Sequence, residues 1–144
     1  MNIQQIPEHE LARLREKAKE ITGSQSDYHS SYTELLTRRL NGEPLQYIEE
    51  YIPFYSIQIN VDQRCLIPRP ETEILVDYVN NHFSSPIKVL DAGTGSGCIG
   101  ISIALKNPSL NVYGSDHSVD ALNVALINKN ILNVNNFSLV HADW

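Results

Sequence analysis

Three alternating glycines follow a short apolar run in the stretch VLDAGTGSGCIG, residues 89–100. Gly93, Gly95 and Gly97 let the backbone turn sharply and come close to a ligand, because they carry no side chain. An apolar strand is predicted to end here and a helix to begin, which is where open parallel sheets bind small molecules. The expected ligand-binding loop consists of Gly93, Thr94, Gly95, Ser96 and Gly97.

The glycine spacing fits two kinds of ligand. Gly95, Gly97 and Gly100 also spell the G-x-G-x-x-G pattern of dinucleotide-binding enzymes. In those enzymes the first glycine follows the strand at once, and the diphosphate rests on the helix N-terminus. Here the triplet begins four residues after Asp91, and its last glycine is predicted to lie inside the helix. This late register favours a ligand without a diphosphate.

Acidic residues at the predicted strand ends help to distinguish a dinucleotide from a ligand without a diphosphate. Asp91 would repel a diphosphate and attract an ammonium or sulfonium group, by about 1 to 4 kcal/mol at a separation of ~4 Å. Asp116 ends the next strand and can accept from the hydroxyls of a ribose, which nicotinamide cofactors and S-adenosylmethionine both carry. Asp143 and Trp144 follow a third strand, where an acid suits an adenine amino group and an indole suits its ring face.

The elements that must position these residues alternate between strand and helix. Strands are predicted over 87–93, 111–116 and 137–143, with helices over 97–107 and 118–130. This alternation is typical of right-handed βαβ units, so the fold class is predicted as α/β with a parallel βαβαβ sheet. The first strand is apolar, which is typical of a strand covered on both faces, but in this half of the sheet it is expected to lack its neighbour.

Shorter elements precede this sheet. Helical spacing of Leu11, Leu14, Ala18 and Ile21 predicts a helix over 7–22. A polar stretch, 23–31, is expected to separate it from a short helix over 32–40, and alternating apolar residues over 47–62 predict a β-hairpin.

A proline-rich turn then leads into a further predicted helix. Pro68 and Pro70 are followed by Glu71 and Glu73, whose charges suit a helix N-terminus. The apolar face of this helix is expected to comprise Ile74, Leu75, Tyr78 and Val79.

Composition limits the partners. Seventeen acidic against eleven basic residues give a formal charge of −6, which argues against nonspecific nucleic-acid binding. The first twenty residues lack the apolar core of a secretory signal, and the longest apolar stretch, 87–105, contains Lys88 and Asp91. Cys65 and Cys98 form no metal-binding or disulfide pattern. We therefore expect a cytoplasmic protein with reduced thiols, no membrane contact and no metal.

Five segments together resemble one family. RRLNGEPLQYI, CLIPRPETEILVDYV, VLDAGTGSGCIGISIAL, VYGSDHSVDALNVA and HADW occur in this order and spacing in the release-factor glutamine methyltransferases, the HemK/PrmC family. The resemblance covers residues 37–144. The glycine loop alone indicates only a class I methyltransferase, whereas LIPRPETE about 20 residues before it is much more specific.

The resemblance implies transfer of a methyl group from S-adenosyl-L-methionine to a glutamine side-chain amide in a peptide chain release factor. It implies that the glycine loop holds the methionine end of this cofactor, that Asp116 takes the ribose, and that Trp144 belongs to the cofactor pocket. The sheet would then be the first half of a Rossmann-like class I methyltransferase sheet. The PRPETE segment would lie near the active-site entrance.

The same resemblance divides the chain and shows a departure from the family. It implies a shortened helical substrate-binding region at 1–43, a β-hairpin linker at 44–68 and half of the methyltransferase domain at 69–144. The family's catalytic Asn-Pro-Pro-Tyr segment is absent from the printed sequence. No catalytic residue is therefore assigned, and the 144-residue chain alone is expected to be inactive and to self-associate through an exposed sheet edge.

Three other interpretations stay open. A methyltransferase acting on an RNA or DNA base nitrogen would share the glycine loop. A noncatalytic fragment that binds S-adenosylmethionine or a protein partner would need no catalytic asparagine. A nicotinamide dehydrogenase is disfavoured by Asp91 and by the late glycine register.

Overall fold

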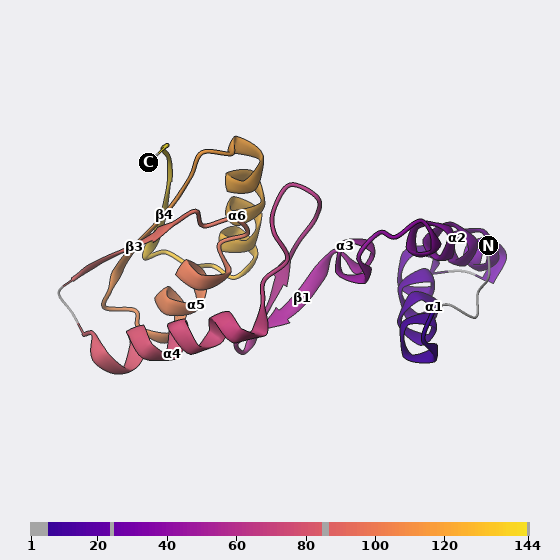
Figure 1. The fold of residues 1–144 in the computed structure, drawn as a ribbon, viewed down its shortest axis with the longest axis horizontal. Helices are drawn as coiled ribbons and strands as arrows, with labels where there is room; N and C mark the ends of the chain where they lie inside the picture. Colours follow the sequence, from indigo (N-terminus) through magenta and orange to yellow (C-terminus); the bar gives the residue numbers. More distant parts are fainter. Residues whose placement is uncertain (1–5, 24, 85–86, 144) are drawn as a thin grey trace. The chain divides into compact units, whose positions relative to one another are not determined.

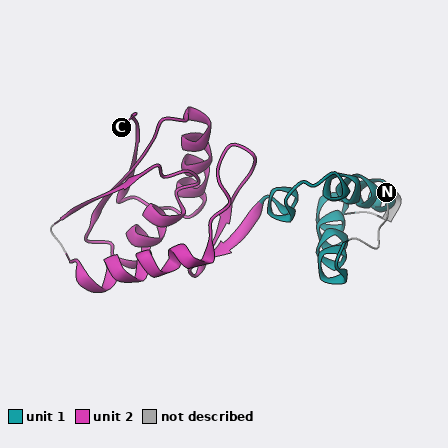
Figure 2. Ribbon diagram, in the orientation of Figure 1, with its two compact units in different colours: residues 1–50 teal, residues 51–144 magenta. Residues whose placement is uncertain are grey.

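The computed structural model describes residues 6–23, 25–84 and 87–143. The chain divides into two compact units, residues 1–50 and residues 51–144 (Figure 2). Within the described ranges, no helix combines the length and the apolar character needed to cross a membrane.

The described residues of the first unit form three helices (Figure 1). They are α1 (Glu8–Thr22), α2 (Gln25–Leu40) and α3 (Leu45–Glu49). Their core consists of Leu14, Ala18, Leu35, Leu45 and Ile48. Gly23 ends α1 in the left-handed conformation, φ 53°, as expected of a helix-terminating glycine.

Two expectations about this unit are wrong. Ile21 was expected on the buried face of the first helix, but it is 56% exposed because the core lies against Leu14 and Ala18. The polar stretch 23–31 is not a linker, since α2 begins at Gln25. Tyr28 and Tyr32, stacked with ring centroids 6.1 Å apart, pack against the core, and this tertiary contact favours helix over the local polar composition.

Ion pairs tie the three helices together. Arg39 of α2 donates to Glu10 of α1 through Nε at 2.6 Å, and this guanidinium lowers the pKa of Glu10. Arg13 of α1 pairs with Glu49 of α3, whose side chain is buried. These charge-assisted contacts join residues far apart in sequence, so they fix the packing of the helices rather than the helices themselves.

The second unit begins with the predicted hairpin in shortened form. Strands β1 (Tyr51–Phe54) and β2 (Ile57–Asn60) are antiparallel, with Ile52 opposite Ile59. The strand expected from residue 47 starts later, because residues 45–49 form α3 and place Leu45 and Ile48 in the helical core.

The proline-rich turn leads into a 3-10 turn, η2 (Pro70–Thr72), and then α4 (Glu73–His82). The helix was predicted, but its expected apolar face is wrong. Val76 is fully buried, whereas Ile74, Leu75 and Tyr78 are 73%, 49% and 54% exposed. Apolar residues are spread around most of this helix, so periodicity alone did not identify the side that packs against α5.

The parallel sheet and its helices confirm the α/β prediction. The strands β3 (Lys88–Ala92), β4 (Asn111–Asp116) and β5 (Phe137–His141) run in the order β3-β4-β5. Helices α5 (Cys98–Lys106) and α6 (Val119–Ile131) connect them (Figure 1). Because the strands are parallel, Asp91 near the end of β3 and Asp116 at the end of β4 lie at the same edge of the sheet.

One face of this sheet is covered and the other is open. Val112 and Phe137, register partners on the face toward the helices, are buried. On the opposite face Leu90 of β3 is 65% exposed and Val140 of β5 is 45% exposed. Such an apolar strand is typical of a sheet covered on both faces, and among the described residues it is covered on only one, which agrees with the incomplete cover expected of this half of the sheet.

Candidate cofactor-binding site

The glycine loop follows β3 and leads directly into α5. Gly93, Gly95 and Gly97 have φ of 74°, 55° and 82°, a left-handed conformation that residues with side chains adopt only under strain. The N–H groups of Gly93 and Thr94 both donate to the carbonyl of Ser115 at 2.8 Å. The loop is thereby attached to the end of β4.

Asp91 holds the loop to the first turn of α5. Its Oδ2 accepts from Thr94 Oγ1 at 2.7 Å and from the N–H of Gly100 at 3.0 Å. The side chain is buried, and burial raises the pKa of Asp91, although these two hydrogen bonds act in the opposite direction. One carboxylate oxygen is therefore committed to the protein, and a contact of Asp91 with a ligand stays a prediction.

Asp116 holds the other side of the loop. Its Oδ2 accepts from the N–H of Gly95 at 2.9 Å, and its Oδ1 accepts from the N–H of Ser118 at 3.0 Å. These bonds place the last residue of β4 between the glycine loop and the start of α6. The ribose contact predicted for Asp116 would share these oxygens with backbone donors.

The part of the loop open to solvent is its backbone at two glycines. Gly93 is exposed and Gly95 half-buried, and a Cβ added to either would meet no atom within 4 Å. Thr94 and Ser96 are buried, so their side chains are turned into the protein. Open space above exposed backbone groups is what a ligand contacted through the backbone requires.

Close packing below the loop depends on residues that sequence reasoning missed. A Cβ on Gly100 of α5 would lie 2.5 Å from Phe137 Cε2. A Cβ on Gly114 of β4 would lie 2.6 Å from Phe137 Cζ and 2.8 Å from Thr94 Oγ1. A glycine in the middle of a predicted strand often marks such an approach, and Gly114 carried that signal.

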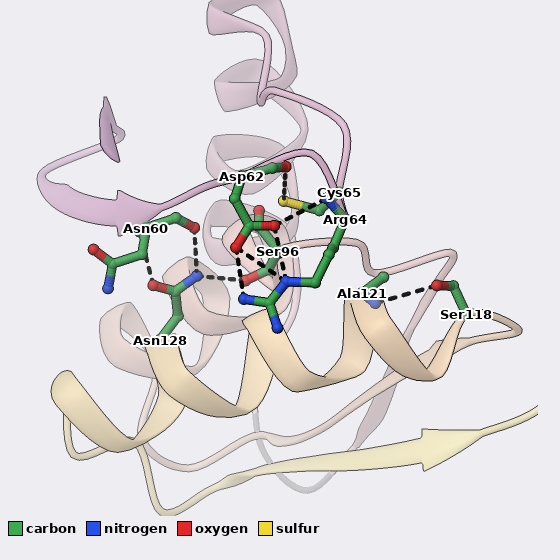
Figure 3. A network of polar contacts seen from close by, with 8 residues as sticks. All are labelled: Asn60, Asp62, Arg64, Cys65, Ser96, Ser118, Ala121 and Asn128. Carbon is green, nitrogen blue, oxygen red and sulfur yellow. Dashed lines mark hydrogen bonds and ion pairs between the residues drawn. The ribbon is translucent and has the colours of Figure 1, made fainter. Parts of the chain in front are cut away.

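A buried amide joins the loop to the hairpin (Figure 3). Asn128 of α6 accepts from the N–H of Asn60 at 2.8 Å and donates to the carbonyls of Asn60 and Ser96, both at 2.9 Å. The same view shows Arg64 paired with Asp62, and this guanidinium lowers the pKa of Asp62. The motifs gave no indication of Asn128, because asparagine is mostly a surface residue.

The other residues that the sequence singled out lie outside the glycine loop. Asp143 is exposed just beyond β5, and Trp144 lies outside the described residues. In the PRPETE segment Arg69 and Glu71 are exposed. Cys98 is a thiol at the start of α5, and burial raises its pKa to about 12. Across the described ranges, no group of three or more His, Cys, Asp or Glu side chains could hold a metal ion.

Comparison with known proteins shows that this chain is similar to methyltransferases. Residues 83–144, which include the glycine loop and all three strands of the parallel sheet, match the model of a methyltransferase domain. A release factor glutamine methyltransferase of Aliivibrio fischeri is 41% identical over 115 residues, which is 79% of this chain and 40% of the relative. The chain is thus similar to methyltransferases both in this domain and along the part of its curated relatives that it matches. The resemblance to release-factor glutamine methyltransferases is thus confirmed.

Further comparisons agree with this assignment. A release factor glutamine methyltransferase of Thermodesulfovibrio yellowstonii is 41% identical over 128 residues, 86% of this chain and 45% of the relative. The chain therefore spans less than half the length of either relative. The crystal structure of a Pyrococcus abyssi tRNA (uracil-54, C5)-methyltransferase is similar with a TM-score of 0.53 at 24% identity, over 65% of this chain and 24% of that one. This likeness supports the Rossmann-like methyltransferase fold.

Proposed function

We propose that this chain is the S-adenosyl-L-methionine-binding part of a methyltransferase that modifies the side-chain amide of a glutamine in a peptide chain release factor. The observation that carries the proposal is the glycine loop. Its backbone is exposed at Gly93, half-buried at Gly95 and held by Asp91 and Asp116, in a chain similar to proteins named release factor glutamine methyltransferase.

The residues of the loop fit this cofactor. The backbone at Gly93 and Gly95, whose N–H groups already donate to Ser115 and Asp116, would lie against its methionine end, and the open space beside these glycines leaves room for it. Asp116, at the end of β4, would accept from the ribose hydroxyls. Acidic side chains at the loop favour a ligand with a positive charge and no diphosphate. When bound, S-adenosylmethionine supplies an activated methyl group on a sulfonium.

The substrate assignment rests on the relatives and on the resemblance of the motifs. A glutamine amide nitrogen is a poor nucleophile, because its lone pair is delocalised into the carbonyl. Transfer to it requires groups that orient the amide toward the methyl group. We assign none of the described residues to this task. The exposed Arg69 and Glu71 of the PRPETE segment are the residues that we expect near the substrate.

Two further properties belong to the proposal. We place the chain in the cytoplasm, where the thiols of Cys65 and Cys98 would stay reduced. We also expect the chain to self-associate, because Leu90 on the open sheet face and Ile74 on α4 are large, apolar and exposed.

Titration calorimetry tests the cofactor. S-adenosylhomocysteine and S-adenosylmethionine should bind more tightly than NAD, because Asp91 disfavours a diphosphate at the loop. Tighter binding of NAD would refute the proposal.

A methyl-transfer assay tests the substrate, with the whole protein of which this chain is part. Radiolabelled methyl transfer to a release factor should disappear when the acceptor glutamine is replaced by asparagine. Transfer to RNA instead of the release factor would contradict the substrate assignment while leaving the cofactor assignment intact.

A further inference from the structure

Asn128 connects three parts of the second unit. It belongs to α6, its amide oxygen accepts from strand β2 at Asn60, and its amide nitrogen donates to Asn60 and to the loop at Ser96 (Figure 3). The side chain is 1% exposed, so it cannot touch a ligand above the loop. Both amide hydrogens and the oxygen are used, so this buried group has its hydrogen bonds.

The hydrogen bond from Asn128 to Ser96 lies within the loop that is proposed to bind the cofactor. Ser96 lies between Gly95, whose N–H donates to Asp116, and Gly97, which precedes the first residue of α5. Asp116 therefore holds this segment at the N–H of Gly95, and Asn128 holds it at the carbonyl of Ser96. Glycines impose little conformational preference of their own, so such external contacts must select the backbone conformation. A loop fixed before binding loses less conformational entropy when it receives a ligand.

We propose that Asn128 is a positioning residue for the cofactor loop. It fixes the carbonyl of Ser96, and through it the backbone of Gly93 and Gly95, without contacting the cofactor. The same amide anchors Asn60, the last residue of β2, so the chain that leads toward the PRPETE segment shares this anchor. This inference rests on the proposed cofactor-binding function of the loop.

A second asparagine in the same unit provides a matched control. The amide nitrogen of Asn136 donates to the carbonyls of Ala104 and Leu110, both at 3.0 Å. It thereby fixes the connection between α5 and β4, at the opposite end of the sheet from the glycine loop. Its loss should lower folding stability in a similar way, but the carbonyls that it holds lie outside the cofactor loop.

The test compares Asn128→Ala with Asn136→Ala in the full chain. Both should lower the melting temperature. Only Asn128→Ala should weaken S-adenosylhomocysteine binding, by about tenfold, the factor that corresponds to one lost buried hydrogen bond. Hydrogen exchange should quicken at residues 93–97 in Asn128→Ala and at residues 107–110 in Asn136→Ala. Should Asn128→Ala fail to fold, Asn128→Ser takes its place, because it keeps a polar group without burying a charge and is too short to join Asn60 to Ser96.

Two results would overturn the positioning role. One is an unchanged affinity in the Asn128 variant with unchanged exchange of the loop. The other is an equal loss of affinity in Asn136→Ala, which would mean that general destabilisation weakens binding. If the wild-type chain binds no S-adenosylhomocysteine, the proposed function fails, and the exchange of residues 93–97 still decides whether Asn128 holds the loop.

Discussion

The two strand-end aspartates hold the loop in addition to the ligand roles predicted from their positions. Asp91 accepts from Gly100 and Thr94, and Asp116 accepts from Gly95 and Ser118. Asp91 therefore satisfies one backbone N–H and one hydroxyl, and Asp116 satisfies two backbone N–H groups. These hydrogen bonds depend on the backbone conformation of the glycine loop. The spacing of residues in the sequence does not define that conformation, so the bonds could not be predicted.

Replacement of Asp116 by alanine should weaken cofactor binding about tenfold to a hundredfold, because it removes charge-assisted hydrogen bonds to the ribose and to Gly95. Calorimetry with S-adenosylhomocysteine measures the change. Asp120→Ala is the control, since it removes an exposed acid from the first turn of α6 with the same change in charge. Equal effects of the two substitutions would reduce the role of Asp116 to general electrostatics.

Gly114→Ala should destabilise the second unit by about 1 to 3 kcal/mol, because its Cβ would overlap Phe137 and Thr94. Phe137→Leu should recover part of this loss, which a double-mutant cycle from urea unfolding would measure as a coupling energy. Gly93→Ala is the control, because its Cβ meets nothing within 4 Å and its cost comes from φ alone. Strict additivity of Gly114→Ala and Phe137→Leu would contradict the steric explanation.

At the scale of elements, the sequence predicted the alternating half of the chain better than the rest. The strand over 111–116 has the predicted bounds, and α5 and α6 each begin one residue after their expected starts. These elements were recognised because short apolar strand segments alternate there with segments of helical length, rather than from a strong helical period. Residues 47–49 and 25–31 were assigned to the wrong class, because Ile48 and Tyr28 acquire their helical environment only from the packed core.

The site shows the same division between local and distant information. The glycines placed the loop correctly between β3 and α5, because a turn of this kind is encoded by adjacent residues. The residues that support it, Phe137 and Asn128, come from later elements and reach the loop only through the packing of β5 and α6. No spacing rule connects them to the motif, so sequence reasoning could not find them.

The ion pair between α1 and α2 should make the helical unit sensitive to acid. Arg39 lowers the pKa of Glu10 below its usual 4.5. The stability from this pair is therefore fully present above about pH 4.5 and is lost as the pH falls through the lower folded-state pKa. Glu10→Gln should cost about 1 kcal/mol at pH 7 and flatten the acid limb of thermal melts followed by circular dichroism.

The matched control for this pair is Glu8→Gln. Glu8 also lies in the first turn of α1, but its ion pair with Arg15 is exposed to solvent, so its replacement should leave the acid limb unchanged. If Glu8→Gln and Glu10→Gln flatten the limb equally, the acid sensitivity comes from the helix N-terminus rather than from the contact between helices.

At the scale of the whole molecule, the sheet is covered unevenly. Helices α5 and α6 bury Val112 and Phe137, whereas Leu90 on the other face stays 65% exposed and β3 has no neighbour on its outer edge among the described residues. An apolar side chain on an open strand edge favours pairing with a second chain. The exposed Leu90 and the unpaired edge both belong to β3, the strand that also carries Asp91. A partner that covered β3 would therefore lie close to the cofactor loop.

We therefore expect the 144-residue chain to self-associate in solution, with a weight-average mass in sedimentation equilibrium that rises with concentration above the monomer value of 16.2 kDa. Leu90→Lys should shift the chain toward monomer, because a lysine on an edge strand opposes pairing between chains. Ile131→Lys is the matched control, since Ile131 is 60% exposed at the end of α6, away from the open sheet face. A wild-type chain that stays monomeric at every concentration would show that the open face of β3 does not bind a second copy. If Leu90→Lys and Ile131→Lys reduce the association equally, the association depends on net charge instead of on this strand.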